Sequence, residues 1–507
     1  MTPTLTQVAG MPAVHVATDG GTCSGGLVFR VGWADETLAV RGLTHLVGHL
    51  VLATLPPSEV HHHLEISANH TVLRADGGFE DVTGFVARVC SALRDLPVDR
   101  VEEVKEVLAA ETVTGRPVGG LTQQARYGAR GYGLSAYPEV GLPEIDPELA
   151  QVWAQEAFSR GNAVLWFCGD RSPELVAVPL PEGPRQPLPP VPPSLSPLPG
   201  YLLAPESDTV VLSAVLRRTA ATAAFAHVLD GALDDALRER TGYCVRAGAR
   251  YDVRDGSAAT VVVRADCVPD RRVEALGELV DVLASLRWGT LDARALTAAR
   301  TDLLEEPDPA TLALDAARDL LLSPESAQGV PVERRPTEVR AVSAAALAEV
   351  AAAFGDGALG QVPETGLGWL GWSEVAHPST GLVEPTGDGS PPDGQLVVTG
   401  DGVSLTGPAG TVRVPFERVS AMVSYADGGR WLVGDDGTEV HVEPGVHGLG
   451  PDDAARIDAA VDVARVIHRP ARAGASLPTA TAPDAPPEPE RATPLAGRIL
   501  GRLRGRR

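Results

Sequence analysis

The sequence predicts an α+β protein with two related domains, each an antiparallel sheet with helices packed on it, and a small C-terminal β-rich domain with a closing helix. Three observations support this prediction. A similar order of strand and helix patterns occurs twice in the 507 residues, a chain too long for one core. A proline-rich linker, residues 178–200, separates the two copies. Short alternating segments between Gly and Asp turns fill residues 394–470.

The first domain, residues 1–177, should contain strands around one long apolar helix. Strands alternate or form short apolar runs, whereas helices repeat apolar residues every three to four positions. In chain order we expect strands at 13–17 and 25–33, a helix at 39–55, a strand at 70–77, helices at 80–96 and from 99, and a buried strand at 162–170.

The second domain, residues 201–383, loosely repeats that plan. The expected elements are a strand at 208–216, a helix at 219–240, strands at 246–253 and 258–267, and a helix at 271–286 with further helices behind it. A Gly/Pro/Asp-rich patch at 384–394 marks the next boundary.

The third domain, residues 394–470, reads as hairpins closed by one helix at 452–467, with Ile457, Val461 and Ala464 on one stripe. In element order it resembles a pleckstrin-homology domain. Residues 471–507 should be a disordered proline-rich segment with a basic tail, because they hold few large apolar residues.

Composition excludes several classes of protein. The net charge of −23 argues against a nucleic-acid binder, whose affinity comes from neutralising phosphates. Five scattered cysteines without a CxxC pattern fit reduced thiols better than a disulfide framework. The sequence shows neither a signal-peptide pattern nor a stretch of roughly 18 apolar residues, so we expect a cytoplasmic protein.

The stretch "GLTHLVGHLV", residues 42–51, places His45 and His49 four apart in an apolar run. On a helix this spacing puts both rings on one face, where they can reach a single metal ion. Two buried, hydrogen-bonded core histidines would give the same pattern. The pair alone leaves both interpretations open.

Its surroundings favour the metal site. Residues 31–55, "VGWADETLAVRGLTHLVGHLVLATL", resemble the opening of the pitrilysin/insulinase family of zinc peptidases, where a strand and an acidic turn lead into Gly-x-x-His-x-x-Glu-His. Segments 156–170 and 237–253 resemble later parts of the same family, so the resemblance spans most of residues 10–375. It implies that both histidines bind zinc and that the Glu between them would activate water.

The resemblance also implies a third zinc ligand and a substrate contact. Glu111 falls at the position of the family's glutamate ligand, on a helix whose stripe of Val104, Val107 and Leu108 it continues inward. The alternative is a glutamate at a helix end that reaches solvent. Arg238 matches the family's substrate-binding arginine.

This sequence differs from the family pattern at positions that the family uses for catalysis. Gly48 stands where the family has its catalytic Glu, and glycine cannot accept a proton. Val104 replaces a second acidic residue, Val245 replaces an expected tyrosine, and the 62 residues from His49 to Glu111 are fewer than the family usually has. Loss of a general base generally costs about two to four orders of magnitude in rate.

Two further features carry other interpretations. The run His61–His62–His63 fits a solvated loop better than a metal site, since three adjacent histidines cannot all face one ion. The tail 495–507 alternates apolar residues with arginines, which suggests contact with an anionic membrane or a docking peptide; a solvated arginine-rich tail is the alternative.

Three functions follow. The first is a catalytically inactive pitrilysin/insulinase-like subunit or peptide-binding scaffold, paired with an active homologue. The second is an active zinc peptidase whose base comes from Glu65, Glu80 or a partner. The third is a membrane-associated adaptor that works through the C-terminal domain and tail.

Overall fold

The computed structural model describes most of the chain. The described residues are 2–55, 61–111, 119–172, 178–290, 293–324, 329–363, 366–376, 395–407, 410–443, 447 and 451–472. The boundary patch 384–394, the proline-rich segment from residue 476 and the basic tail 495–507 lie outside them.

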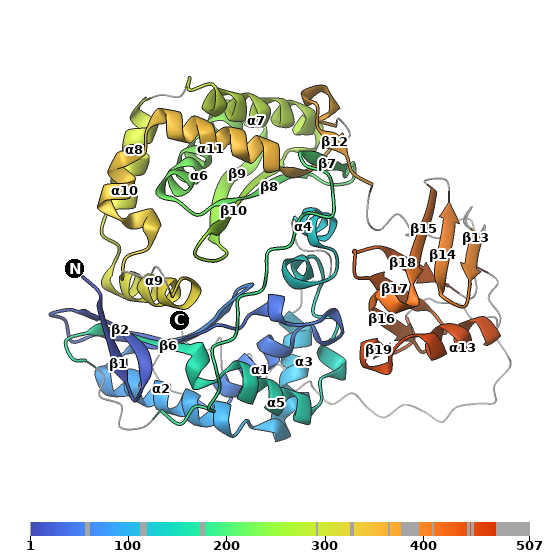
Figure 1. The fold of residues 1–507 in the computed structure, drawn as a ribbon, viewed down its shortest axis with the longest axis horizontal. Coiled ribbons are helices and arrows are strands. Elements are labelled where there is room, and N and C mark those ends of the chain that lie inside the picture. The colour runs from blue at the N-terminus through green and yellow to red at the C-terminus, as the bar shows by residue number, and fades with distance from the viewer. Residues whose placement is uncertain are drawn as a thin grey trace, which may run out of the picture.

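Two six-stranded sheets, each covered by helices, form the body of the molecule and lie one above the other in Figure 1. The first has the strand order β1-β2-β6-β3-β5-β4 and is antiparallel except between β2 and β6. Its strands are β1 (Thr4–Val8), β2 (Met11–Ala17), β3 (Cys23–Phe29), β4 (His61–Ile66), β5 (Thr71–Gly77) and β6 (Ala163–Gly169). The predicted α+β class is confirmed.

Helices from the same half cover one face of this sheet. They are α1 (Leu43–Leu52), α2 (Phe79–Arg94), α3 (Val101–Glu111) and α5 (Pro147–Ala157). Leu27, Leu73 and Leu165 point into this core, whereas Val28, Val72 and Val164 point to the opposite face. This alternation is what a sheet buried on both faces requires.

The second sheet has the order β12-β7-β11-β8-β10-β9. Its strands are β7 (Gly200–Leu203), β8 (Thr209–Arg217), β9 (Cys244–Val253), β10 (Ala258–Cys267), β11 (Leu359–Val362) and β12 (Ser373–Glu374), and its helices are α6 (Ala220–Leu233), α7 (Arg272–Arg287), α8 (Ala293–Leu304), α10 (Pro336–Ala341) and α11 (Ala344–Gly357). Arg238 lies on a π-helical turn, Asp234–Arg240, that continues α6.

Each half sends a helix onto the other half's sheet (Figure 1). Helix α9 (Pro309–Leu322), from the second half, packs Leu312, Ala316 and Leu321 on the face of the first sheet that is turned toward the second half. Helix α4 (Gly120–Tyr127), from the first half, contacts β7 and β11 through Ala125. The exchange fixes how the halves sit together.

The C-terminal module, residues 395–472, contains a three-stranded and a four-stranded sheet that share one core. Its elements are β13 (Gln395–Val398), β14 (Gly402–Gly407), β15 (Gly410–Pro415), β16 (Val419–Tyr425), β17 (Arg430–Gly434), β18 (Glu439–Val442), α13 (Pro451–Ala460) and β19 (Val466–Arg469). The expected helix 452–467 is too long: α13 ends at Ala460, and the chain returns as β19 beside β16. Ala464 is exposed, so the buried stripe stops at Val461. The pleckstrin-homology likeness stays a prediction.

Two other expectations need correction. The helix expected at 39–55 begins only at Leu43, because Gly42 has a φ of 108° and the chain before it forms a separate 3-10 turn. Residues 61–63 form part of strand β4 and not a loop. Among the described helices, none combines the length and apolarity that crossing a bilayer requires.

Candidate metal site

A buried glutamate fixes the start of the helix that carries both histidines. The Glu36 carboxylate accepts hydrogen bonds from the backbone N–H groups of Gly42 (3.0 Å) and Thr44 (2.7 Å). These donors would otherwise be unpaired at the first turn of α1. Arg41 donates a third hydrogen bond to Glu36, at 3.0 Å. Glu36 therefore fixes the N-terminus of α1, which begins two residues before His45.

The structure brings the three predicted ligands together. His45 and His49 lie one turn apart on α1, with their rings edge to face and the centroids 4.7 Å apart. Glu111 ends α3 beside them, and its Oε2 lies 4.0 Å from Nε2 of His49. The atoms that the three side chains offer to a metal all lie within 4.8 Å of one another.

This geometry fits zinc after a small inward movement. Ligand atoms bound at about 2.0–2.1 Å in a tetrahedron lie roughly 3.4 Å apart. Glu111 is 42 % exposed, so the expectation that it points inward from a buried stripe is wrong. An exposed carboxylate at a helix end retains the rotamer freedom to close that gap.

Glu139 is a polar partner that the sequence did not reveal. Both of its carboxylate oxygens lie 3.0 Å from Nδ1 of His45, although the residues are 94 positions apart. A carboxylate only accepts hydrogen bonds, so Nδ1 carries the proton and Nε2 keeps the lone pair that a metal needs. Glu139 occurs in an irregular segment, and no periodicity links it to α1.

The titration behaviour of the cluster suits metal binding at neutral pH. Burial lowers the pKa of His49 to about 4, helped by the neighbouring His45 and opposed by Glu139. Burial tends to raise the pKa of Glu139, but its hydrogen bond from His45 and the charge of Arg41 hold that pKa below its usual value. At pH 7 His49 is neutral and Glu139 is charged, as metal ligation and its support require.

The position of the missing catalytic base is covered by another side chain. A Cβ on Gly48 would lie 2.6 Å from Cδ2 and 2.9 Å from Cδ1 of Leu64. Leu64 belongs to β4, whose side chains alternate between the two faces of the sheet. Leu64 faces α1, whereas Glu65 pairs with Arg318 of α9 at 2.7 Å on the other face. Glu80 is exposed at the start of α2.

The remaining predicted positions lie away from this cluster. Val104 is buried in the first core. Val245 is 75 % exposed at the start of β9. Arg238 donates two hydrogen bonds to the Asp234 carboxylate, at 2.6 and 2.7 Å, on the surface of the second half. Its role as a substrate contact stays a prediction.

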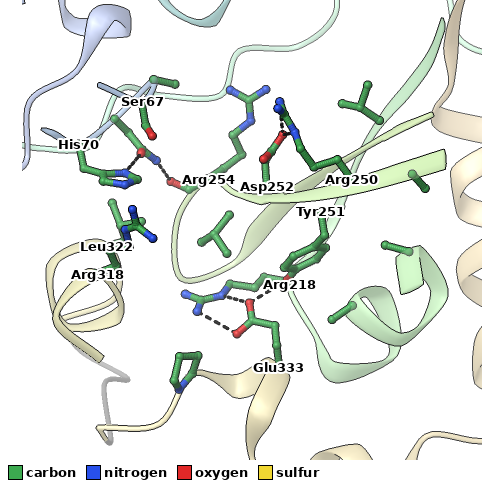
Figure 2. A pocket seen from close by; sticks show the side chains of 18 of the residues that line it. Ser67, His70, Arg218, Arg250, Tyr251, Asp252, Arg254, Arg318, Leu322 and Glu333 are labelled. Atoms are coloured by element: carbon green, nitrogen blue, oxygen red, sulfur yellow. Dashed lines mark hydrogen bonds and ion pairs between the residues drawn. The ribbon is translucent and has the colours of Figure 1, made fainter. Parts of the chain in front are cut away.

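A cavity of about 880 Å³ lies between the two halves, at the far end of β4 (Figure 2). Residues Glu65–His70 form one wall, and the β9–β10 hairpin with Tyr251 and Arg254 forms another. Arg218 is buried in its wall and pairs with Asp319 (2.8 Å) and Glu333 (2.6 Å). Basic and acidic side chains both line the cavity, and several of them pair with one another.

His70, a buried histidine beside this cavity, should make the folded protein less stable in acid. His70 donates a hydrogen bond to the Asn69 side chain (2.8 Å), which in turn donates to the Arg254 carbonyl (2.6 Å) and so joins the halves. Burial lowers the pKa of His70 to about 3, and the charges of Arg318 and Arg30 add to the effect. Below about pH 6.5 His70 becomes protonated in the unfolded chain but stays neutral in the folded chain. The free energy of unfolding therefore decreases as the pH is lowered.

We therefore expect His70→Gln to lose less stability than the wild type between pH 7.5 and pH 5, by roughly 2 kcal/mol. Thermal unfolding at both pH values measures the difference. His227→Gln serves as the matched control, because His227 is half exposed on α6. Equal acid sensitivity in wild type and His70→Gln would contradict the assignment.

Comparison with solved structures identifies the architecture. A protease from Helicobacter pylori superimposes with a TM-score of 0.60 at 14 % identity, covering 72 % of this chain and 99 % of its own. A peptidase M16 inactive domain from Pseudomonas fluorescens gives 0.58 at 15 %, covering 72 % and 99 %. Pitrilysin gives 0.52 at 13 %, covering 70 % of this chain and 44 % of its own.

The chain has a pitrilysin/insulinase-like fold. No protein-family model matches the sequence, and no curated protein does. The pitrilysin-like fold therefore emerges from the arrangement of elements and not from overall sequence similarity. The resemblance drawn from residues 31–55 is confirmed at the level of fold.

Within this pitrilysin-like fold, sequence analysis identified the His45–His49–Glu111 cluster but missed Glu36, Glu139 and Leu64. Glu36 lies in the acidic turn before α1, and its spacing from Gly42 could have indicated a cap. The approaches of Glu139 and Leu64 depend on tertiary packing alone.

Proposed function

We propose that the protein is a catalytically inactive, pitrilysin-like subunit that holds zinc and binds extended peptides, paired with an active homologue. One observation carries the proposal: Leu64 covers Gly48 in the middle of an otherwise complete His45–His49–Glu111 cluster. The side chain that fills this space is apolar, so it does not replace the missing glutamate. Glu65, the nearest alternative on β4, is engaged by Arg318 on the opposite face.

The three side chains would hold the ion, with Nε2 of His45 directed by Glu139. Bound zinc supplies a Lewis acid that polarises water or a carbonyl oxygen. No side chain at position 48 can take the proton from such a water. The site therefore supports metal binding and peptide positioning, and the active partner would hydrolyse the peptide. The Pseudomonas fluorescens neighbour, described as an inactive M16 domain, gives a precedent for the fold without activity.

Strand β4 offers the docking surface for a peptide. It is the last strand of its sheet and is paired only with β5 among the described residues. Ser67 N–H donates to the His70 carbonyl at 2.9 Å. Since hydrogen-bonded pairs alternate along an antiparallel ladder, Glu65 and His63 also face β5, and the backbone groups of Leu64 and Ile66 face outward. An extended peptide can pair with these groups and continue toward the cavity.

We expect Ile66→Pro to weaken binding of an unstructured, fluorescently labelled peptide by about tenfold or more. Proline removes an outward N–H that the sheet itself does not use, and edge strands tolerate it. Ile66→Ala is the matched control, because it loses side-chain area but keeps the N–H. Fluorescence anisotropy measures the affinity, and mass spectrometry checks that the peptide stays intact. Equal binding by both variants would contradict docking on β4.

The membrane-adaptor function was predicted from the C-terminal domain together with the tail 495–507; the tail lies outside the described residues, and no described feature of the domain favours this function.

A further inference from the structure

The C-terminal module contacts the segment that carries Glu139. Tyr137 and Val140, on either side of Glu139, are buried in one apolar cluster with Val423, Val433 and Ile467 of the module. Arg469 on β19 donates a hydrogen bond to the Val140 carbonyl at 3.0 Å. The module therefore holds the backbone one residue beyond Glu139.

The same segment is pressed against the start of α1. A Cβ on Gly141 would lie 2.5 Å from the backbone N of Arg41, and a Cβ on Gly42 would lie 3.0 Å from Cβ of Glu139. Such contacts leave no room for independent movement. Glu139 is thus enclosed between α1 and a segment that the module holds in place.

A second set of contacts ties the module to α4. The Gln124 side-chain amide donates to the Gly437 carbonyl (2.6 Å) and to Oε1 of Glu439 (2.7 Å). Ala129 N–H donates to the Asp435 carbonyl at 3.2 Å, and a Cβ on Gly128 would lie 2.1 Å from that carbonyl oxygen. The module is therefore anchored just before the segment 131–144, through Gln124 and Ala129, and within it, at Val140.

We propose that Glu139 is a positioning residue for the metal ligand His45 and that the C-terminal module sets metal affinity by bracing the segment around Glu139. This inference rests on the proposed zinc site. The carboxylate fixes both the proton on Nδ1 and the plane of the ring, so that Nε2 points at the ion. A module that tightens or releases this segment changes the metal site without touching the ion.

The first test replaces Glu139 with Gln, which keeps its size but removes its charge. We expect the zinc Kd, measured by competition with a chromogenic chelator, to rise about 10- to 100-fold. The visible absorption of the cobalt-loaded protein should shift as well, since it reports ligand geometry. Glu139→Asp keeps the charge on a shorter side chain, and we expect it to recover part of the affinity. Thermal unfolding of each variant checks that the fold is retained.

The second test addresses the brace. Arg469→Ala removes the hydrogen bond to Val140, and we expect a smaller, several-fold rise in the zinc Kd. Arg465→Ala is the matched control, because among the described residues Arg465 donates to two carbonyls of the module itself, those of Glu417 and Val419. Its Kd should match the wild type.

The outcomes separate the two proposals. A wild type that binds no zinc would remove the metal site itself. A zinc-binding wild type whose Kd and cobalt spectrum are unchanged in Glu139→Gln would overturn the positioning role alone. Equal Kd values for Arg469→Ala and Arg465→Ala would overturn the brace.

Discussion

Replacing His45 or His49 with alanine is expected to weaken zinc binding by more than about 100-fold. Each imidazole is one of three protein ligands, and loss of a ligand costs more than the 10–100-fold typical of an outer-shell partner. Glu111→Ala should also weaken binding strongly, because its carboxylate completes the cluster. Metal analysis of protein dialysed against trace zinc gives the stoichiometry, and chelator competition gives the Kd.

His227→Ala is the matched control for these variants. His227 is half exposed on α6, where it pairs with Asp302 at 2.8 Å and takes no part in the cluster. Zinc content close to one per chain should persist in this variant. The ligand assignment would be wrong if His45→Ala kept wild-type affinity.

Restoring the base should require two changes and not one. Gly48→Glu alone forces the new Cβ against Leu64, at 2.6 Å, and we expect it to destabilise the protein by about 1–3 kcal/mol with little activity. Combined with Leu64→Ala, the carboxylate gains room beside the two histidines. A general base is worth about 10²- to 10⁴-fold in rate, so the double variant should hydrolyse unstructured peptides in a chelator-sensitive way.

The Gly48→Gln, Leu64→Ala variant is the control, because it fills the same space without a proton acceptor. Leu64→Ala alone separates the effect of opening the site from that of the base. Hydrolysis is followed by mass spectrometry of the products, and unfolding by temperature. If Gly48→Glu alone were as active and as stable as the double variant, Leu64 would not be what closes the site.

The sequence predicted the fold class because local periodicity was strong in both halves. The apolar runs at 162–170 and 258–267 became β6 and β10. The predicted boundaries were wrong where the backbone conformation ends a helix. The apolar pattern begins before Gly42, but α1 begins only after it, and α13 ends at Ala460, before β19. A helical pattern shows apolar spacing but does not reveal where the chain turns to pair with another strand.

The sequence also predicted the ligands of the candidate site but not the residues packed around them. A four-residue spacing and a family resemblance identified His45, His49 and Glu111, which do lie together. The contacts of Glu139 with His45 and of Leu64 with Gly48 join segments 94 and 16 residues apart. Such approaches arise from how α1, β4 and the segment around Glu139 pack. The spacing of residues along the sequence does not reveal this packing.

The most direct test of the proposed function is an assay of zinc-loaded wild-type protein with an unstructured peptide, followed by mass spectrometry. The proposal predicts that the peptide binds and is recovered intact. Cleavage that a chelator stops and that His45→Ala abolishes would contradict it, and would show that the protein hydrolyses peptides despite Gly48.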